Sequence, residues 1–379
     1  MRIPQTSLAN DNLADLLRLI RSENIGPVTF FQLIKRFGTA KAALAAIPDL
    51  AQRGGKRQIN ICSSDIIEKE INNTHKLGAK FVVYGQKEYP ELLHYLHDAP
   101  PVLSILGNVH LLNNKPIMGM VGARNASASG CAFARKIAHE LGEQGYIVAS
   151  GLARGIDAYA HSGALTTGTI ASIAGGIDNV YPPENAKLRA QIIELGVIIS
   201  ENPFGSTPLA RHFPARNRII SGVSRGILVV EASPKSGSLI TAEFALEQGR
   251  EVFAVPGSPL DPRAQGCNKL IKQGAVLVQS IHDIMDGLST NFSLADSDNG
   301  QFYAANLATI SENAISEADI IKAHKLIDEK LGASPVSIDE LQSQTDLSIS
   351  LIMSCLLEKE IAGTVQRHLG NKISKNYDI

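Results

Sequence analysis

Short apolar runs alternate with amphipathic stretches through the middle of the chain. The apolar runs have the composition of strands covered on both faces of a parallel sheet. They are 117–121, 146–149, 169–174, 197–200, 226–232 and 251–255. The stretches between them have helical spacing, and the predicted helices are 131–141, 156–165, 184–195 and 239–248. Strands and helices that alternate at this pace predict a doubly wound parallel α/β sheet with right-handed crossovers.

The pattern ahead of this region is helical at first. Leu13–Ile20 and Thr29–Phe37 predict two short amphipathic helices around a tight turn that contains Gly26 and Pro27. The spacing is that of a helix-hairpin-helix, whose turn can hold a DNA phosphate through backbone N–H groups, but the turn has only one glycine. A small helical packing domain and a DNA-binding one both stay open. Further strands are predicted at 81–84, at 102–106 and, at a sheet edge, at 275–278.

The last part of the chain changes character again. Residues 287–306 are rich in Ser, Asn, Asp and Gly, which indicates a flexible linker. Three helices and a hairpin are predicted after it, in the order of a winged helix, at 317–331, 337–344, 348–359 and 361–373. The third helix has no Lys or Arg before Lys359, whereas DNA readers place several there. We therefore expect a protein-contacting or structural winged helix.

These patterns predict four segments. They are a small helical domain at 1–78, the sheet core at 79–287, a flexible linker at 288–312 and a winged-helix domain at 313–379. A chain ended near Thr290 is then expected to expose little buried surface.

Polar, glycine-rich loops follow several of the predicted strands. They are 122–127, 150–155, 175–178 and 233–238. The carboxyl ends of parallel strands meet at one rim of the sheet, where helix N-termini offer free N–H groups to anions and where ligands bind. The sequence therefore predicts a single site at this rim.

Arginines gather around these loops. Residues 202–230 contain no Asp or Glu but four arginines, which are Arg211, Arg216, Arg218 and Arg225. Arg124 and Arg154 stand at the tips of two loops. The planar fork of an arginine binds phosphate oxygens in pairs, so a ligand touched by several of them carries several phosphates, as a nucleic-acid strand does. The alternative is a solvated positive helix whose arginines pair with acids elsewhere.

The known nucleotide motifs are absent from the sequence. It contains no GxxxxGK[ST], and the first loop is Gly122-Ala123-Arg124 instead of GxGxxG, which disfavours a Walker-type NTPase and a dinucleotide dehydrogenase. The polar residues at the rim also admit enzymatic interpretations. Asp157 with His161 has the spacing of an acid/base pair, although a histidine that packs the helix and is hydrogen-bonded near the rim is the preferred explanation. Ser236 and Ser238 lack a GxSxG elbow and are explained as phosphate donors or a helix cap.

Two acidic residues at strand ends leave similar alternatives. Glu201 and Glu231 could bind a metal or a ribose, or they could pair with the rim arginines. Neither a metal site nor a disulfide framework is predicted, because the four cysteines are far apart and form no CxxC pair.

Composition limits the kind of partner. The net charge is −1, with 44% hydrophobic and 19% charged residues, so any nucleic-acid surface is a local patch on a globular protein. Trp is absent and aromatics are 5%, which leaves few rings for base stacking. No signal core or membrane-spanning apolar run is found in the sequence, and we expect a cytoplasmic protein.

Several motifs in order resemble the DNA-processing protein A family, DprA or Smf. They begin with Val121–Arg124, with Ser150–Asp157 and with Ala160-His161, followed by Asp178 with Tyr181-Pro182. They continue with Ile199–Glu201, Phe213–Ile220, Ser236–Ala242 and Val255–Gly257. The resemblance implies an extended Rossmann-like core, with a small SAM- or helix-hairpin-helix-like N-terminal domain and a C-terminal winged helix.

The resemblance also implies a function. Family members are non-enzymatic recombination mediators that bind and protect single-stranded DNA, load the RecA recombinase during natural transformation, and work as homodimers without a cofactor. It points to Arg124 as the arginine of a basic DNA pocket on the Rossmann rim. With the residues taken from the loops themselves, the predicted DNA or phosphate site is Gly122, Arg124, Ser127, Gly151, Arg154, Lys187, Arg216, Asn217, Arg218, Ser236, Gly237 and Ser238.

The chain departs from the family pattern at two points. Ala123 stands where the motif usually has Ser, and Pro183-Glu184 follows Tyr181-Pro182 where some members carry a lysine; whether Lys187, a turn later, replaces its charge stays open. A second hypothesis is a nucleotide-processing hydrolase similar to the Rossmann-like phosphoribohydrolases. Those enzymes carry a PGGxGT-type motif, and the comparable loop here, 174–178, lacks its Thr and following Glu.

Overall fold

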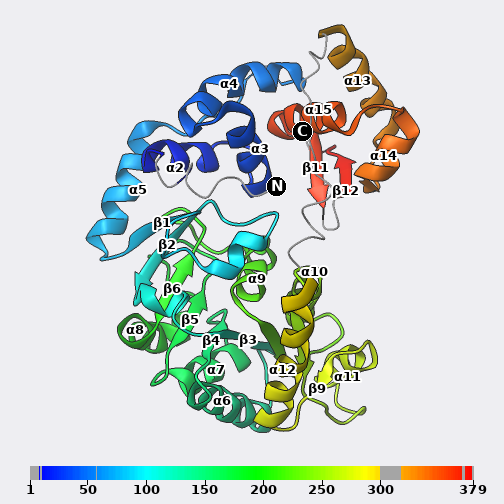
Figure 1. Ribbon diagram of the computed structural model, residues 1–379. Coiled ribbons are helices and arrows are strands. Elements are labelled where there is room, and N and C mark those ends of the chain that lie inside the picture. The colour runs from blue at the N-terminus through cyan, green and yellow to red at the C-terminus, as the bar shows by residue number, and fades with distance from the viewer. Residues whose placement is uncertain (1–7, 9–10, 57, 299–316, 369–371, 378–379) are drawn as a thin grey trace. The chain divides into compact units, whose positions relative to one another are not determined.

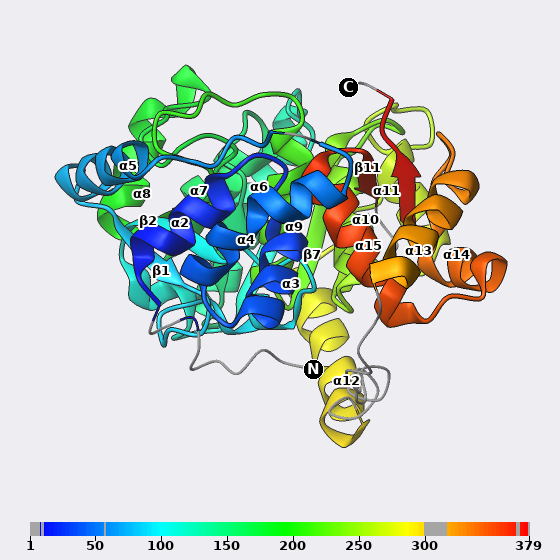
Figure 2. The same ribbon diagram turned by 90° about the horizontal axis from the view of Figure 1, so that it is seen from above.

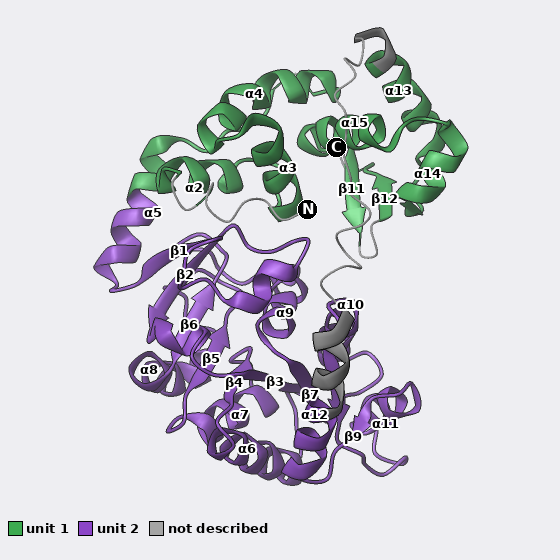
Figure 3. Ribbon diagram, in the orientation of Figure 1, with its two compact units in different colours: residues 1–68, 300–379 green, residues 69–299 purple. Residues whose placement is uncertain are grey.

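The computed structural model describes residues 8, 11–56, 58–298, 317–368 and 372–377. The chain forms two compact units (Figure 3). One contains residues 1–68 and 300–379, and the other contains residues 69–299. The predicted boundary at residue 78 falls after α5 (Ser64–Lys76), a helix whose sequence belongs partly to each unit.

A nine-stranded sheet is the centre of the second unit, and its order is β1-β2-β6-β5-β4-β3-β7-β8-β9 among the described residues. The strands are β1 (Lys80–Val83), β2 (Val102–Gly107), β3 (Ile117–Gly122), β4 (Ile147–Ser150), β5 (Thr169–Ser172), β6 (Val197–Ser200), β7 (Gly226–Val230), β8 (Glu251–Ala254) and β9 (Val276–Leu277). Strands β3 to β9 all pair parallel with one another, which confirms the doubly wound prediction. The two strands predicted ahead of them, β1 and β2, pair antiparallel at one edge.

Helices cover both faces of this sheet. Helices α6 (Ala128–Glu143) and α7 (Ile156–Ala164) pack against each other and against β3 and β4 (Figure 1). On the other face, α9 (His212–Val223) packs against β3, β4 and β5, and α10 (Gly237–Glu247), which lies next to α9, packs against β7 and β8 (Figure 2). The remaining helices of the unit are α8 (Ala186–Leu195), α11 (Gln265–Lys272) and α12 (Ile281–Asp298), with the short 3₁₀ turns η1 (Glu91–Tyr95), η2 (Val109–Leu112) and η3 (Pro183–Asn185).

Alternate side chains of each central strand enter different cores. Met118 and Met120 of β3 are buried with the helices α6 and α7, whereas Val121 packs with β7, β8 and α10 on the other face. A strand buried on both faces must be apolar at every position. This is why the central strands appear in the sequence as continuous apolar runs.

The segment predicted as a flexible linker, 288–312, begins instead as a helix. Helix α12 runs from Ile281 to Asp298, and 299–312 lie outside the described residues. Ile284 and Leu288 are buried in the core beneath α6, and the carboxylate of Asp283 accepts the backbone N–H groups of Gln279 and Ser280, both at 2.8 Å. A helix that is nucleated and anchored in this way extends through Ser, Asn and Asp, which by composition alone indicated a loop.

The first unit contains the N-terminal helices α2 (Leu13–Arg21), α3 (Pro27–Phe37) and α4 (Ala40–Arg53). Asn12 and Thr39 cap α2 and α4 by accepting a backbone N–H in the first turn, and Pro27 opens α3 with its preset φ. Leu16, Phe30 and Leu33 are fully buried in this helical part. The two helices predicted around the turn are thus present.

The winged helix belongs to the same unit. It is built from α13 (Glu317–Lys330), α14 (Ile338–Thr345) and α15 (Ile349–Ala362), with a small sheet of β10 (Val336–Ser337), β12 (Lys372–Lys375) and β11 (Val365–His368). Ser337 and Ser348 cap α14 and α15. Strands β11 and β12 are the predicted hairpin wing.

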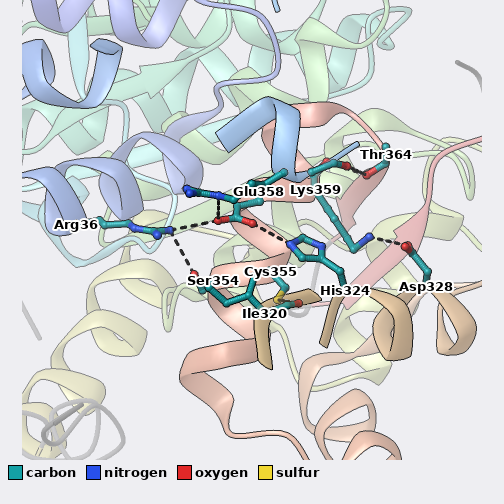
Figure 4. A network of polar contacts seen from close by, with 11 residues as sticks. Arg36, Ile320, His324, Asp328, Ser354, Cys355, Glu358, Lys359 and Thr364 are labelled. Carbon is teal, nitrogen blue, oxygen red and sulfur yellow. Dashed lines mark hydrogen bonds and ion pairs between the residues drawn. The ribbon is translucent and has the colours of Figure 1, made fainter. Parts of the chain in front are cut away.

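Helix α15 packs against α3 and α4 through a buried polar network (Figure 4). The carboxylate of Glu358 is 1% exposed and is paired with Arg53 at 3.0 Å, His324 at 2.8 Å and Arg36 at 3.9 Å. Two further bonds join the same elements, from Thr29 Oγ1 to Glu360 and from the side-chain amide of Asn24 to the carbonyl of Ile361. The winged helix therefore has a structural partner in its own chain.

This packing corrects the expectation that a chain ended near Thr290 exposes little buried surface. Removal of the tail would uncover Arg36, Arg53 and Thr29 and leave them without Glu358 and Glu360. The sequence did not reveal this because the partners stand more than 300 positions apart. Among the described residues, no helix is both long and apolar enough to cross a membrane.

Candidate functional site

The candidate site is a cavity at the topological switch point of the sheet, where the order of the strands reverses between β3 and β7. Strands β3 and β7 are neighbours, although β4, β5 and β6 separate them in the sequence, and their register pairs Gly122 with Val230. The loops that leave the two strands therefore start side by side at the carboxyl rim, where open α/β sheets bind ligands. They help to enclose a cavity of about 700 Å³. Its lining contains the predicted residues Gly122, Arg124, Arg216, Asn217, Ser236, Gly237 and Ser238.

Arg124 and Phe213 form one wall of this cavity. Arg124 is exposed at the tip of the β3 loop, and its guanidinium carbon lies 4.8 Å from the centre of the Phe213 ring. The Phe213 ring in turn lies 5.7 Å from that of Tyr181, which is exposed. A guanidinium above an aromatic face gains about 0.5–1 kcal/mol at exposed sites. The pair places a guanidinium, which can donate hydrogen bonds to a phosphate, next to the flat apolar face of an aromatic ring.

Arg216 is the buried cation of the cavity. It is 4% exposed, its Nη1 donates to the Ser172 carbonyl at 3.0 Å, and its Nε has no hydrogen-bond partner among the described residues. Burial lowers the pKa of Arg216 to about 10, Asp157 opposes this effect, and the charge of Arg124 adds to it. The group is still charged at neutral pH. A Cβ added to Gly151 would lie 1.5 Å from Nη1, so this position has room only for glycine.

Asp157 is the one acidic side chain among the described lining residues. Its Oδ2 accepts the N–H groups of Gly151 at 3.1 Å and Ala153 at 3.3 Å, which shapes the loop after β4. Burial raises the pKa of Asp157, while Arg216 and these two N–H groups lower it. The positive charges of Arg124 and Arg216 together outweigh the negative charge of Asp157, so the lining attracts anions.

The first turn of α10 forms another wall. Ser236 caps the helix, accepts the N–H of Ser238 and lies with its hydroxyl 2.7 Å from that of Ser238. The side-chain amide of Asn217 on α9 donates to the Gly237 carbonyl at 3.3 Å. The amino end of α10, with its partial positive charge, therefore lines the same space as Arg124 and Arg216.

Other predicted site residues lie outside the described lining of this cavity. Gly151 lines a smaller hollow beside it, together with Tyr181 and Arg216. Ser127 caps α6, and both its backbone N–H, at 2.8 Å, and its hydroxyl donate to Glu231. Glu231 is thereby occupied with the end of a helix, not with a rim arginine.

Two predicted cations also stand apart from the cavity. Arg154 is 63% exposed and pairs with Glu184 at 3.6 Å. Lys187 is exposed in the first turn of α8. Neither is among the described lining residues.

Arg218 requires a correction. Its side chain is buried, and its guanidinium pairs with Glu201 and, at 3.5 Å, with Asp98. Burial alone would lower the pKa of Arg218, but these two carboxylates raise it above the ordinary value. This is the arrangement considered as the alternative, an arginine paired with acids elsewhere. We therefore take Arg218 out of the candidate site.

Models of known protein families match the chain. The model for DNA recombination-mediator protein A matches residues 80–289, which is more than half of the chain. The chain belongs to the DNA recombination-mediator protein A family. Two further models of the DprA family cover the rest: the DprA-like N-terminal HHH domain matches 10–73, and the DprA winged helix domain matches 316–371.

Relatives in this family are similar along most of the chain. Protein Smf of Synechocystis sp. is 33% identical over 402 residues, which cover 97% of this chain and all of the relative. DNA processing protein DprA of Bacillus subtilis is 44% identical over 213 residues, which cover 56% of this chain and 72% of the relative.

Solved structures of the family resemble the model. DNA processing protein A of Streptococcus pneumoniae is 34% identical, with a TM-score of 0.59 over 76% of this chain and 98% of that one. The protein of Helicobacter pylori, described for its single-stranded DNA binding mode, is 27% identical, with a TM-score of 0.52 over 56% of this chain and 96% of that one.

The site of this family member contains residues that the sequence analysis did not name as site residues. Phe213 lines the cavity and Tyr181 lines the smaller hollow, so two rings lie at the site despite the low aromatic content. The aromatic residue directly ahead of Pro-Ala-Arg was the available signal. Thr241 and Arg263 also line the cavity, and Arg263 is paired with Asp261 at 2.9 Å. Nothing in the sequence around Arg263 indicated a site residue, because its loop reaches the rim only in the folded protein.

The acid/base candidates have structural roles in this protein. His161 is fully buried, its Nε2 accepts the N–H of Leu152 at 3.3 Å, and its Nδ1 lies 2.7 Å from Thr169 Oγ1. Burial, together with the charge of Arg216, lowers the pKa of His161 to about 3, so the imidazole is neutral at pH 7. Among the described residues, no group of three or more His, Cys, Asp or Glu could hold a metal ion.

Proposed function

We propose that this protein binds single-stranded DNA in the cavity at the β3/β7 rim. The observation that carries the proposal is the meeting of Arg124, Arg216 and the amino end of α10 around one cavity in a member of the recombination-mediator family. The Helicobacter pylori relative, described as binding single-stranded DNA, supports it. Phosphate oxygens would bind the guanidinium groups, and a base would lie on Phe213.

The rest of the mediator role is part of the same proposal. The bound strand would be protected and handed to the RecA recombinase during natural transformation, by a homodimer of this chain in the cytoplasm. Family membership supports this role. The net charge of −1 also suits it, since a protein without a general affinity for polyanions can release the strand to the next protein.

We propose binding without catalysis. A hydrolase needs an acid or base with a free proton site near the ligand, and His161 has both ring nitrogens engaged inside the protein. Asp157 lines the cavity, but its Oδ2 is held by two backbone N–H groups. These contacts favour a structural role for the residues that the hydrolase hypothesis needs.

The test is Arg124→Ala with Arg154→Ala as its matched control, because both lose one exposed arginine. We expect Arg124→Ala to weaken binding and to flatten the dependence of log K on log salt by about 0.7, the value for one phosphate of a single strand. Arg154→Ala should leave both unchanged. Fluorescence anisotropy with labelled oligonucleotide at several salt concentrations measures the two quantities.

Equal affinity and slope for Arg124→Ala and the wild type would contradict the cavity as the DNA site. A loss for Arg154→Ala as large as that for Arg124→Ala would show that the strand binds beyond the cavity lining.

A further inference from the structure

The first turn of α10 has features that its packing within the chain does not require. Gly237 begins the helix without a positive φ, and a Cβ added there would meet no heavy atom within 4 Å. The absence of a side chain therefore serves neither the backbone conformation nor the internal packing. It leaves open space directly above the end of a helix of 11 residues.

A buried hydroxyl lies one helical turn further on. Thr241 lines the cavity, is 1% exposed, and its Oγ1 has no hydrogen-bond partner among the described residues. Residues four apart lie on the same face of a helix, so Gly237 and Thr241 face the same space. A buried polar atom without a partner destabilises the folded protein. A ligand oxygen in the cavity would satisfy it.

Arg124, Arg216 and Asp157 leave one net positive charge around this space, and the partial positive charge at the amino end of α10 brings the total above the charge of one phosphodiester. Burial is the main reason why the pKa of Arg216 is lowered, repulsion by Arg124 adds to this effect, and the amino end of α10 contributes further positive potential. Asp157 is the one acid in the described lining, and Arg263 is already paired with Asp261. An internal phosphodiester brings one negative charge. A phosphate monoester brings about 1.5 to 2 at neutral pH.

We propose that the first turn of α10, with Gly237, Ser238 and Thr241, binds a phosphate monoester. The proposal rests on the cavity being the DNA site and specifies what enters it. The same dianionic group is present at a phosphorylated strand end and on a free nucleoside monophosphate. The terminal phosphate lies against the open backbone of Gly237, hydrogen-bonds Thr241 Oγ1 and faces the guanidinium of Arg216.

The experiment compares oligo-dT of one length in four forms: 5′-phosphorylated, 3′-phosphorylated, hydroxyl-ended and circular. We expect one of the phosphorylated forms to bind about tenfold more tightly than the hydroxyl-ended and circular forms, which should bind alike. Thymidine 5′-monophosphate as a competitor separates the two sources. Displacement of the phosphorylated end at low concentration would show that the site also accepts the free nucleotide, and failure to displace it would restrict the site to strand ends.

Gly237→Ala tests the position itself. It fills the open space without a steric clash in the chain, so the protein should fold as the wild type does while the preference for a phosphorylated end disappears. Thr241→Val should reduce the same preference without loss of stability, since the hydroxyl has no partner in the chain. Gly332→Ala, at another glycine with no atom near its Cβ position, is the matched control and should keep the preference.

Equal binding of all four DNA forms by the wild type would overturn this inference and leave single-strand binding intact. Persistence of the preference in both Gly237→Ala and Thr241→Val would overturn the assignment to α10. Absence of binding to every form, the circle included, would instead contradict the proposed function on which the inference rests.

Discussion

Arg216 and Arg218 stand two positions apart on α9 and have opposite surroundings. Residues at this spacing do not share a helix face. Arg216 lines the cavity with its Nη1 on the Ser172 carbonyl, whereas Arg218 faces Glu201 and Asp98 on the other side. One arginine of the motif is therefore available to a ligand and the other stabilises the fold.

We expect Arg218→Ala to lower the free energy of unfolding by about 3 kcal/mol, because it removes the buried positive charge that Glu201 and Asp98 share. The DNA affinity of the folded protein should stay at the wild-type value. Urea unfolding and anisotropy titration measure the two effects. Arg154→Ala, which breaks an exposed pair, should cost less than about 1 kcal/mol. A stable Arg218→Ala protein with weakened DNA binding would return Arg218 to the site.

The protonation of His161 makes the free energy of unfolding depend on pH. The pKa of His161 is about 3 in the folded protein and about 6.5 in an unfolded chain, so between these values the unfolded state binds a proton that the folded state does not. Stability from this group is complete above pH 6.5 and falls by about 1.4 kcal/mol for each pH unit below it. Urea unfolding between pH 6 and 4 gives the free energy of unfolding at each pH. In His161→Gln this free energy should fall less steeply with decreasing pH than in the wild type, by this amount for each pH unit. Equal slopes would contradict the neutral, buried imidazole.

At the scale of elements, α15 uses its buried side for contacts within the chain. Glu358, Lys359 and Glu360 are all buried, and their partners come from α3, α4, α13 and β11. A run of three charged residues in a helix ordinarily indicates a solvated face. Here each of these buried charges is paired with a residue of opposite charge, because an unpaired charge is costly to bury.

Glu358→Gln is expected to destabilise the unit of residues 1–68 and 300–379 by about 3 kcal/mol, because Arg36 and Arg53 lose a buried counter-charge. Glu329→Gln, at an exposed position of α13, is the control and should change stability by less than about 0.5 kcal/mol. Hydrogen exchange in α3 and α4 reports on this unit specifically. Unchanged protection in Glu358→Gln would mean that the network adds no net stability.

At the scale of the whole molecule, the candidate binding cavity and the polar network that stabilises the winged helix lie in different units. The cavity lies entirely within residues 69–299, and the polar network lies entirely within the other unit. Helices from the two ends of the chain build that first unit together. A truncation at the C-terminal end should therefore affect the N-terminal helices.

We expect a chain ended at Asp298 to lose protection from hydrogen exchange in α3 and α4, since Arg53 and Thr29 lose Glu358 and Glu360. Its single-strand affinity should stay within about threefold of the full chain, a difference of about 0.7 kcal/mol. Matched anisotropy titrations of the two proteins give the affinity. A loss beyond tenfold, with the core still folded, would show that the tail contributes to DNA binding.

Much of the core could be predicted because its signals are local. A strand covered on both faces is apolar throughout, and a cap or a glycine marks the ends of a helix, so β3 to β9 and most helices around them were predicted close to their observed positions. Parallel strands place their carboxyl ends on one rim whatever their order. The meeting of the loops after β3, β4 and β7 at one cavity followed from the sequence for this reason.

The tertiary structure alone decided which side chains of the motifs meet. Arg218 turned from the cavity because Asp98, far ahead in the chain, and Glu201 lie on its side of α9. Arg263 reached the cavity through the packing of a distant loop. Contacts of this kind join residues that no periodicity relates. The sequence by itself determined the strands, most of the helices and the rim, and long-range packing determined which charges are available there to a ligand.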